Sequence, residues 1–179
     1  MDLKKRTIAF VNEILSDEEL RSFPIDLDKI ALKLGIILQP FEFSNDISGL
    51  LTIDEQLRPK IGYNTSENRE RQRFTIAHEI GHYILHSNSQ KGIFVDKMMF
   101  RKNISFYNKN EESMEVEANY FAANLLMPKA LILKAVSQID PYLDDDDNIS
   151  NLAKDFCVSK TAMTYRLINL KLFRSLELA

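Results

Sequence analysis

The sequence predicts an α+β fold, in which a helical core packs against a small, mainly antiparallel sheet and is followed by a pair of helices. Three observations lead to this prediction. Apolar residues recur at helical spacing along most of the chain, three short runs rich in Ile, Leu and Phe lie between residues 35 and 63, and a polar break precedes the last helical patterns. We therefore expect one domain over residues 1–142 and a separate C-terminal segment over residues 148–179.

The first half of the chain predicts two helices followed by three strands. Apolar residues follow a helical period over residues 3–15, and a second short helix is expected between the N-cap Asp26 and Gly35. Strands are expected at residues 35–43, 48–53 and 60–63.

A long helix is expected from the N-cap Ser66 to about His86. Apolar or small side chains surround its middle, and a helix of this kind usually lies buried at the centre of a domain. The rest of the chain predicts a loop-rich connection at residues 87–110, helices at 112–127 and 128–139, an acidic break at 144–147 and two helices from residue 149.

Composition limits the class of protein. The chain has 179 residues, of which 45% are hydrophobic, and a net charge of -3, which argues against a protein built mainly to coat nucleic acid. Its single cysteine, Cys157, forms no intramolecular disulfide, which suits a reducing cytosol. No stretch resembles a secretory signal or reaches the ~18 apolar residues of a membrane span. We expect a cytoplasmic protein with no membrane partner.

All three histidines lie within nine residues, and two of them frame the sequence His78-Glu79-Ile80-Gly81-His82. In this HExxH pattern the histidines lie on one helix face, about 6 Å apart along the axis, and can bind one metal ion. Glu79 lies toward the same side and can accept a proton from water. The pattern also occurs by chance, but its place on a buried helix strengthens it, because burying ionisable groups without a function costs free energy.

A third protein ligand is needed, with one metal position left for water or substrate. His86 lies roughly 12 Å from His78 along an unbroken helix, which is too far for a shared metal, so we expect it to cap the helix or support the site. Glu115 and Asn119 share one face of the following helix, so Glu115 can bind metal while Asn119 holds an imidazole. Glu117 points to nearly the opposite side and is the alternative ligand. Small residues would let the two helices approach closely: Ala77, Gly81, Ala118 and Ala122.

Two segments resemble the ImmA/IrrE-type zinc endopeptidases. They are residues 73–86, which carry the HExxH pattern, and residues 115–128, which begin Glu-Val-Glu-Ala-Asn-Tyr-Phe-Ala-Ala. Residues 47–51 and 61–64 also suit the family pattern. The resemblance covers roughly residues 25–135, and the paired motifs are much more specific than HExxH alone.

The resemblance implies a zincin-like (gluzincin) helical core in which His78, His82 and Glu115 bind Zn2+ and Glu79 is the catalytic acid/base. It further implies a bacterial or phage endopeptidase whose protein substrate is a partner transcriptional repressor or similar regulator. Glu79 would take a proton from water and pass it to the leaving amine. A strand edge at residues 47–53 is a candidate for holding substrate as an added strand. Two histidines and a carboxylate also suit other divalent metals.

The C-terminal segment resembles a helix-turn-helix, because Leu-Ala-x-x-Phe-x-Val-Ser precedes a helix that Ser159 would cap. Four residues are the candidate DNA contacts: Lys160, Thr161, Thr164 and Arg166. An aspartate run and a weakly basic second helix argue against DNA binding, since phosphates need a clear positive face. We expect residues 149–173 to dock a protein substrate or to complete the fold.

The leading prediction is thus a zinc endopeptidase acting on a protein regulator. The alternative is a non-catalytic regulatory module that binds protein or DNA and keeps zinc as a structural element. Glu79 favours the enzyme, because a structural site needs no general base. Structural zinc sites are also usually closed and rich in cysteine, whereas Cys157 lies far along the chain.

Overall fold

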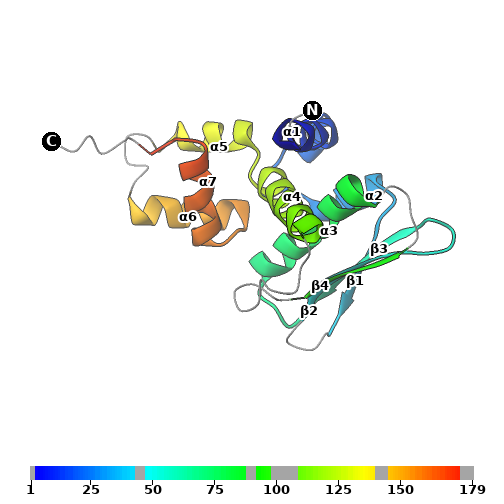
Figure 1. Ribbon diagram of the computed structural model, residues 1–179. Helices are drawn as coiled ribbons and strands as arrows, with labels where there is room; N and C mark the ends of the chain where they lie inside the picture. The colour runs from blue at the N-terminus through cyan, green and yellow to red at the C-terminus, as the bar shows by residue number, and fades with distance from the viewer. Residues whose placement is uncertain (1–2, 43–46, 88–91, 98–108, 140–144, 174–179) are drawn as a thin grey trace.

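The computed structural model describes residues 3–42, 47–87, 92–97, 109–139 and 145–173. In these residues the chain forms seven α-helices, one short 3-10 helix and a four-stranded sheet, so the predicted α+β class is confirmed. The helices of the second half are α3 (Arg69–His86), α4 (Lys109–Leu126), α5 (Lys129–Val136), α6 (Asp146–Phe156) and α7 (Lys160–Asn169). Helices α3 and α4 lie between the sheet on one side and α5 to α7 on the other (Figure 1). None of the described helices is long and apolar enough to cross a bilayer.

The sheet has the strand order β1-β3-β2-β4. Its strands are β1 (Ile37–Phe41), β2 (Ile47–Ile53), β3 (Pro59–Asn64) and β4 (Gly92–Lys97). Strand β1 pairs parallel with β3, whereas β2 pairs antiparallel with both β3 and β4, so the sheet is mainly antiparallel as predicted. Strand β4 corrects the prediction of a loop-rich connection at residues 87–110, because six residues are too few for a period to be recognised in the sequence.

The prediction of an open strand edge at residues 47–53 is wrong. Strand β2 lies inside the sheet, and its Leu51 is in register with Ile61 of β3 on one side and Phe94 of β4 on the other. Because the backbone groups of an inner strand are already paired, a substrate cannot add a strand there. The edges of the described sheet are β1 and β4.

The N-terminal helices end where the sequence predicts. They are α1 (Leu3–Ile14), the 3-10 helix η1 (Glu18–Leu20) and α2 (Leu27–Lys33). The side chain of Asp26 caps α2 by accepting a hydrogen bond of 3.0 Å from the Lys29 backbone. Gly35 follows the helix with φ +69°, a left-handed conformation that favours glycine.

The start of α3 differs from the prediction. Asn68 is the N-cap, and its Oδ1 accepts a hydrogen bond of 2.9 Å from the Arg71 backbone. Ser66, the predicted cap, instead donates its hydroxyl to Oδ1 of Asn64 and belongs to the turn before the helix. Both residue types are good caps, and the strand that precedes the helix decides which of them comes into position.

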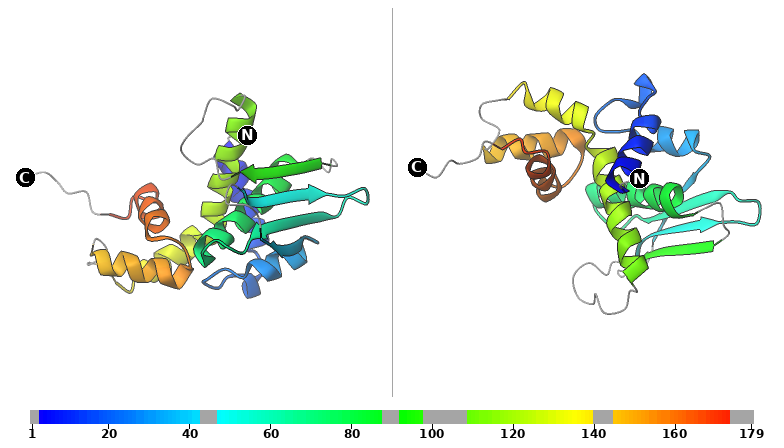
Figure 2. Two further views of the ribbon diagram at one scale, coloured as in Figure 1. Left: turned by 90° about the horizontal axis from the view of Figure 1, so that it is seen from below. Right: turned by 45° about the horizontal axis from the view of Figure 1, so that its top comes forward.

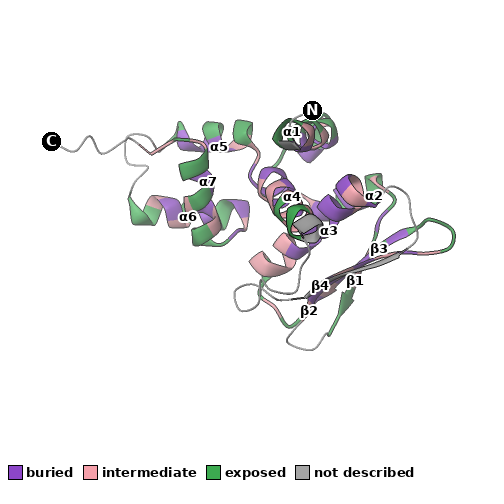
Figure 3. Ribbon diagram, in the orientation of Figure 1, coloured by how far each residue is buried: buried purple, intermediate pink, exposed green. Residues whose placement is uncertain are grey.

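One hydrophobic core runs through the described residues, and the ribbon of Figure 3 marks the buried positions along the helices. The middle of helix α3 is buried, as predicted, with Ala77 and Ile80 fully excluded from solvent. The same core includes Ile132 of α5, Phe156 of α6 and Leu167 of α7. The division at residues 142 and 148 therefore stays a prediction.

Replacing the observed cap tests where α3 begins. We expect Asn68→Ala to lower the free energy of unfolding by about 0.5–2 kcal/mol, because it leaves an N-terminal backbone donor of α3 without a partner. Ser66→Ala is the matched control, and its loss should stay within about 0.5 kcal/mol. Urea unfolding measures both, and a larger loss in Ser66→Ala would restore Ser66 as the cap.

Candidate metal centre

Three side chains from two neighbouring helices converge on one point. His78 and His82 project from α3, and their Nε2 atoms are 2.9 Å apart. Glu115 projects from α4, with Oε2 3.3 Å from Nε2 of His78 and Oε1 3.2 Å from Nε2 of His82. These ligand atoms form a group that could hold a metal ion.

The distances within this group suit a tetrahedral metal. Bonds of 2.0–2.1 Å to nitrogen and oxygen place neighbouring tetrahedral ligands roughly 3.3–3.4 Å apart. The two histidine–carboxylate distances, 3.3 and 3.2 Å, agree with this value, and the histidine–histidine distance of 2.9 Å is slightly shorter. Lone pairs that face each other so closely need a shared proton or a cation between them, so the donor set fits a metal ion.

Burial differs among the three side chains. The side chain of His78 is 0% exposed and that of His82 7% exposed, whereas that of Glu115 is 32% exposed. Burial raises the pKa of Glu115, but the hydrogen bonds that His78 and His82 donate when their Nε2 atoms carry a proton outweigh it and hold the pKa well below its usual range. The carboxylate is therefore charged at every physiological pH and available to a cation.

Asn119 orients the first histidine, in the arrangement predicted for it. Its Oδ1 lies 3.1 Å from Nδ1 of His78, so Nδ1–H can donate to the amide oxygen. This hydrogen bond selects the tautomer whose Nε2 lone pair faces His82 and Glu115. Nδ1 of His82 has no hydrogen-bond partner among the described residues.

Close packing of α3 on α4 brings the ligands together. A Cβ atom added at Gly81 would lie 3.1–3.2 Å from side-chain atoms of Phe121, which shows how near the helices run. Ala77, Ala118 and Ala122 are also fully buried, as the predicted close approach requires. Burial of a side chain such as Phe121 stabilises this packing by about 1.5–3 kcal/mol.

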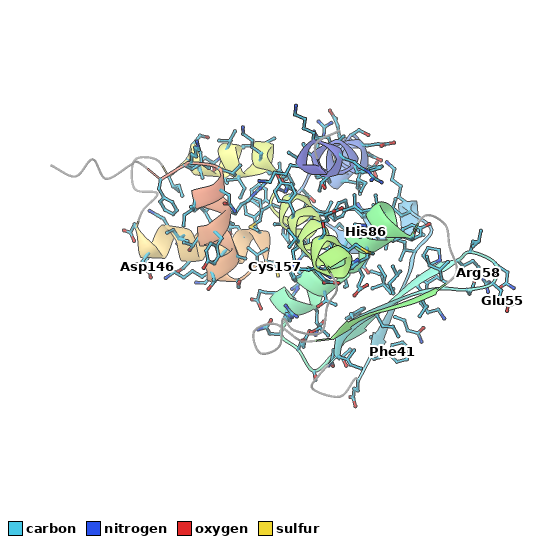
Figure 4. The ribbon with its side chains drawn as sticks, viewed as in Figure 1. Phe41, Glu55, Arg58, His86, Asp146 and Cys157 are labelled. Carbon is cyan, nitrogen blue, oxygen red and sulfur yellow. The ribbon has the colours of Figure 1, made fainter. Side chains whose placement is uncertain are left out.

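His86 and Glu117 lie outside the group, next to each other. Nε2 of His86 is hydrogen-bonded to the Met114 carbonyl at 3.2 Å and is 3.8 Å from Oε2 of Glu117. Burial and the neighbouring His82 lower the pKa of His86, which keeps its ring neutral near pH 7. His86 is the last residue of α3 and lies beside α4 (Figure 4). His86 therefore joins α3 to α4, whereas the C-cap of α3 is Ser87, and its support of the site stays a prediction.

Glu79 is fully buried at the junction of α3 and the sheet. A Cβ atom at Gly49 of β2 would lie 3.3 Å from Oε1 of Glu79 and would overlap the methyl group of Thr75. Only glycine therefore allows β2 to pass this close to the carboxylate. This role of Gly49 was not predicted, although a glycine inside a predicted strand is a possible signal of close approach by another chain segment.

The C-terminal helices correct the candidate DNA contacts. Arg166 is only 6% exposed, and its guanidinium donates to the Met127 carbonyl and to Asn124, so it drops out as a candidate DNA contact. Lys160 forms an ion pair with Asp146 of α6. The signal for burial was present, since Arg166 shares its helix face with the apolar Met163 and Leu167. Ser159 caps α7 as predicted, by accepting from the Ala162 backbone.

The fold and the site define a class, a mixed α+β domain in which His78, His82 and Glu115 could hold a metal ion. Comparison with known proteins agrees, because the family model of the IrrE N-terminal-like domain, a peptidase family, matches residues 31–168. The chain therefore belongs to the ImmA/IrrE family of metallopeptidases.

A curated relative has a phage origin. The chain is 27% identical over 100 residues to uncharacterized immunity region protein 2 of Bacillus phage phi105. The match covers 56% of this chain and 57% of that protein, so the chain spans little more than half the length of this relative.

Elemental analysis of the purified protein tests the metal ligands. We expect about one divalent metal ion per chain, lost in Glu115→Ala because two buried imidazoles alone hold the ion weakly. Glu117→Ala is the matched control, because this carboxylate points to nearly the opposite side of α4, and it should retain the metal, as should His86→Ala. Loss of metal in Glu117→Ala with retention in Glu115→Ala would reverse the assignment of the third ligand.

A second test concerns the close approach of β2 to α3. We expect Gly49→Ala to lower the free energy of unfolding by about 1–3 kcal/mol, since the new methyl group overlaps that of Thr75. The double variant Gly49→Ala/Thr75→Ser removes the overlapping methyl and should recover most of the loss. Thermal and urea unfolding measure both, and a Gly49→Ala protein as stable as the wild type would contradict the packing described.

Proposed function

We propose that this protein is a zinc-dependent endopeptidase of the gluzincin type, which cleaves a protein substrate. The observation that carries the proposal is the convergence of two imidazoles and a carboxylate beside a buried glutamate, Glu79, which directly follows the first histidine. A structural metal site has no need of such a glutamate, whereas a hydrolase needs a general base at this position.

The donor set supports zinc as the metal. Two histidine nitrogens and a carboxylate, with the fourth position left open, are the ligands of a catalytic zinc site. His78, His82 and Glu115 would hold the ion, and Asn119 would keep His78 in the required tautomer. The bound ion would supply a Lewis acid that polarises the scissile carbonyl.

Glu79 would carry the protons of the reaction. Its carboxylate would accept a proton from the attacking water and deliver it to the nitrogen of the leaving amine. Gly49 would leave room beside the carboxylate, because any larger side chain at this position comes within contact of Oε1. Burial of Glu79 would keep bulk water away from this proton transfer.

The proposed substrate is a repressor-type transcriptional regulator in the cytoplasm. Membership of the ImmA/IrrE family supports it, and the name of the phage relative associates that protein with an immunity region. We propose residues 1–142 as the metallopeptidase domain and residues 148–179 as a helix-turn-helix-like segment. The short turn between α6 and α7, with Ser159 capping the second helix, supports the latter.

The test separates metal binding from chemistry. The full-length protein, loaded with zinc, is incubated with purified repressors encoded next to its own gene, and new N-termini are identified by mass spectrometry. We expect Glu79→Gln to bind zinc like the wild type but to cleave about 10²–10⁴ times more slowly, because the amide cannot accept the proton of water.

A zinc-loaded wild type that cleaves no more than Glu79→Gln would contradict the enzyme and favour the non-catalytic regulatory module. Glu117→Ala serves as the control for a carboxylate removed outside the site, and its cleavage rate should stay within about two-fold of the wild type.

A further inference from the structure

A groove of about 570 Å³ lies on the side of α3 and α4 that faces the C-terminal helices. The two views of Figure 2 show α7 beside these helices, away from the sheet. The groove is lined mainly by apolar side chains, among them Phe74 of α3, Tyr120 and Ala123 of α4, and Ala162 and Tyr165 of α7. Such a groove can take an apolar group of a ligand.

Arg166 places a buried cation in the wall of this groove. The residue is only 6% exposed, and its Nε donates to the Met127 carbonyl and its Nη2 to Oδ1 of Asn124, each at 2.9 Å. The partial negative charge at the C-terminal end of α4 offsets part of the cost of burial. No carboxylate among the described residues pairs with the guanidinium, and Nη1 is bonded to none of them. A buried guanidinium without an anion leaves a strong donor for a ligand.

The charge that the groove offers to a ligand is that of Arg166. Arg71, the other guanidinium of the lining, is paired with Glu67 at 3.6 Å, and Lys160 of α7 is paired with Asp146 of α6. Arg166 has no such partner among the described residues, so it favours a ligand that brings a carboxylate.

The apolar surface continues beyond the groove. Tyr165 is 64% exposed at its rim, and Ile168, one turn further along α7, is 52% exposed. A ligand that covered both side chains as well as the groove would be longer than a single small molecule. A peptide segment has the required length, and its side chains can fill the groove one at a time.

We propose that the groove binds an acidic, apolar peptide segment of a protein partner, with one apolar side chain in the groove and a carboxylate paired with Arg166. Duplex DNA does not fit, because a guanidinium that is almost fully buried cannot reach phosphates on a wide, convex backbone. The groove also borders Asn119, the residue that orients His78, so the segment lies next to the metal centre. Binding at this site does not depend on cleavage and goes beyond the proposed peptidase activity.

Chemical-shift mapping tests the proposal with two blocked peptides, Ac-Leu-Glu-Phe-Leu-NH2 and its neutral counterpart Ac-Leu-Gln-Phe-Leu-NH2. The full-length protein carries Glu79→Gln, so that the peptides stay intact. We expect saturable shifts of the backbone amides of Ala123, Ala162 and Tyr165. The acidic peptide should bind at least about five-fold more tightly than the neutral one, because only it pairs with Arg166.

Three variants locate the interaction. Arg166→Met should abolish the preference for the acidic peptide, and Ala162→Trp, which fills the groove from an incompletely buried position, should abolish binding of both. Lys171→Met removes an exposed charge of the same segment outside the groove and should change nothing. If Arg166→Met does not fold, the proposal is still tested by the binding of Ala162→Trp and by the relative affinity of the protein for the two peptides.

Equal affinity for the two peptides, or shifts confined to other surfaces, would overturn the proposal. A 20-base-pair DNA duplex is titrated in the same way, to distinguish a nucleic-acid ligand from a peptide. Shifts of the Ala162 and Tyr165 amides with the duplex, and none with either peptide, would assign the surface to nucleic acid instead.

Discussion

The close contact between α3 and α4 is the constraint on which the rest of the structure depends. Gly81 faces Phe121 at a distance that leaves no space for another carbon atom without movement of the ring. At this separation the carboxylate of Glu115 reaches both imidazoles of the neighbouring helix. A helix pair spaced by larger side chains would keep the same ligands in sequence but would hold them too far apart for one metal ion.

Helix α4 joins the candidate metal centre to the C-terminal helices. Glu115 and Asn119 lie at the candidate metal centre, whereas Met127, just after the helix, accepts a hydrogen bond from the guanidinium of Arg166 on α7. On the opposite side of α3, Gly49 allows strand β2 of the sheet to pass close to the carboxylate of Glu79. The candidate metal centre thus lies where α3, α4 and the sheet meet. Helix α3 supplies the two histidines and Glu79, α4 supplies Glu115, and the sheet supplies the glycine beside Glu79.

Sequence reasoning reached the local features and missed those that depend on long-range packing. Helical spacing predicted that His78 and His82 share one face of α3 and that Glu115 and Asn119 share one face of α4. The structure agrees, because the geometry of a single helix determines which residues share a face. Strand β4 and the interior position of β2 were missed, since pairing between distant strands leaves no periodic signal. Arg166 was assigned to the surface by residue type, although its neighbours on α7 placed it on the buried face.

The unequal exposure of the three candidate ligands would govern how a metal ion is taken up. Among them only Glu115 offers a substantial part of its side chain to solvent, whereas the side chains of His78 and His82 are enclosed. An ion held here would thus be reached by a chelator from the side of the carboxylate, and its exchange would be slowed by the two enclosed imidazoles.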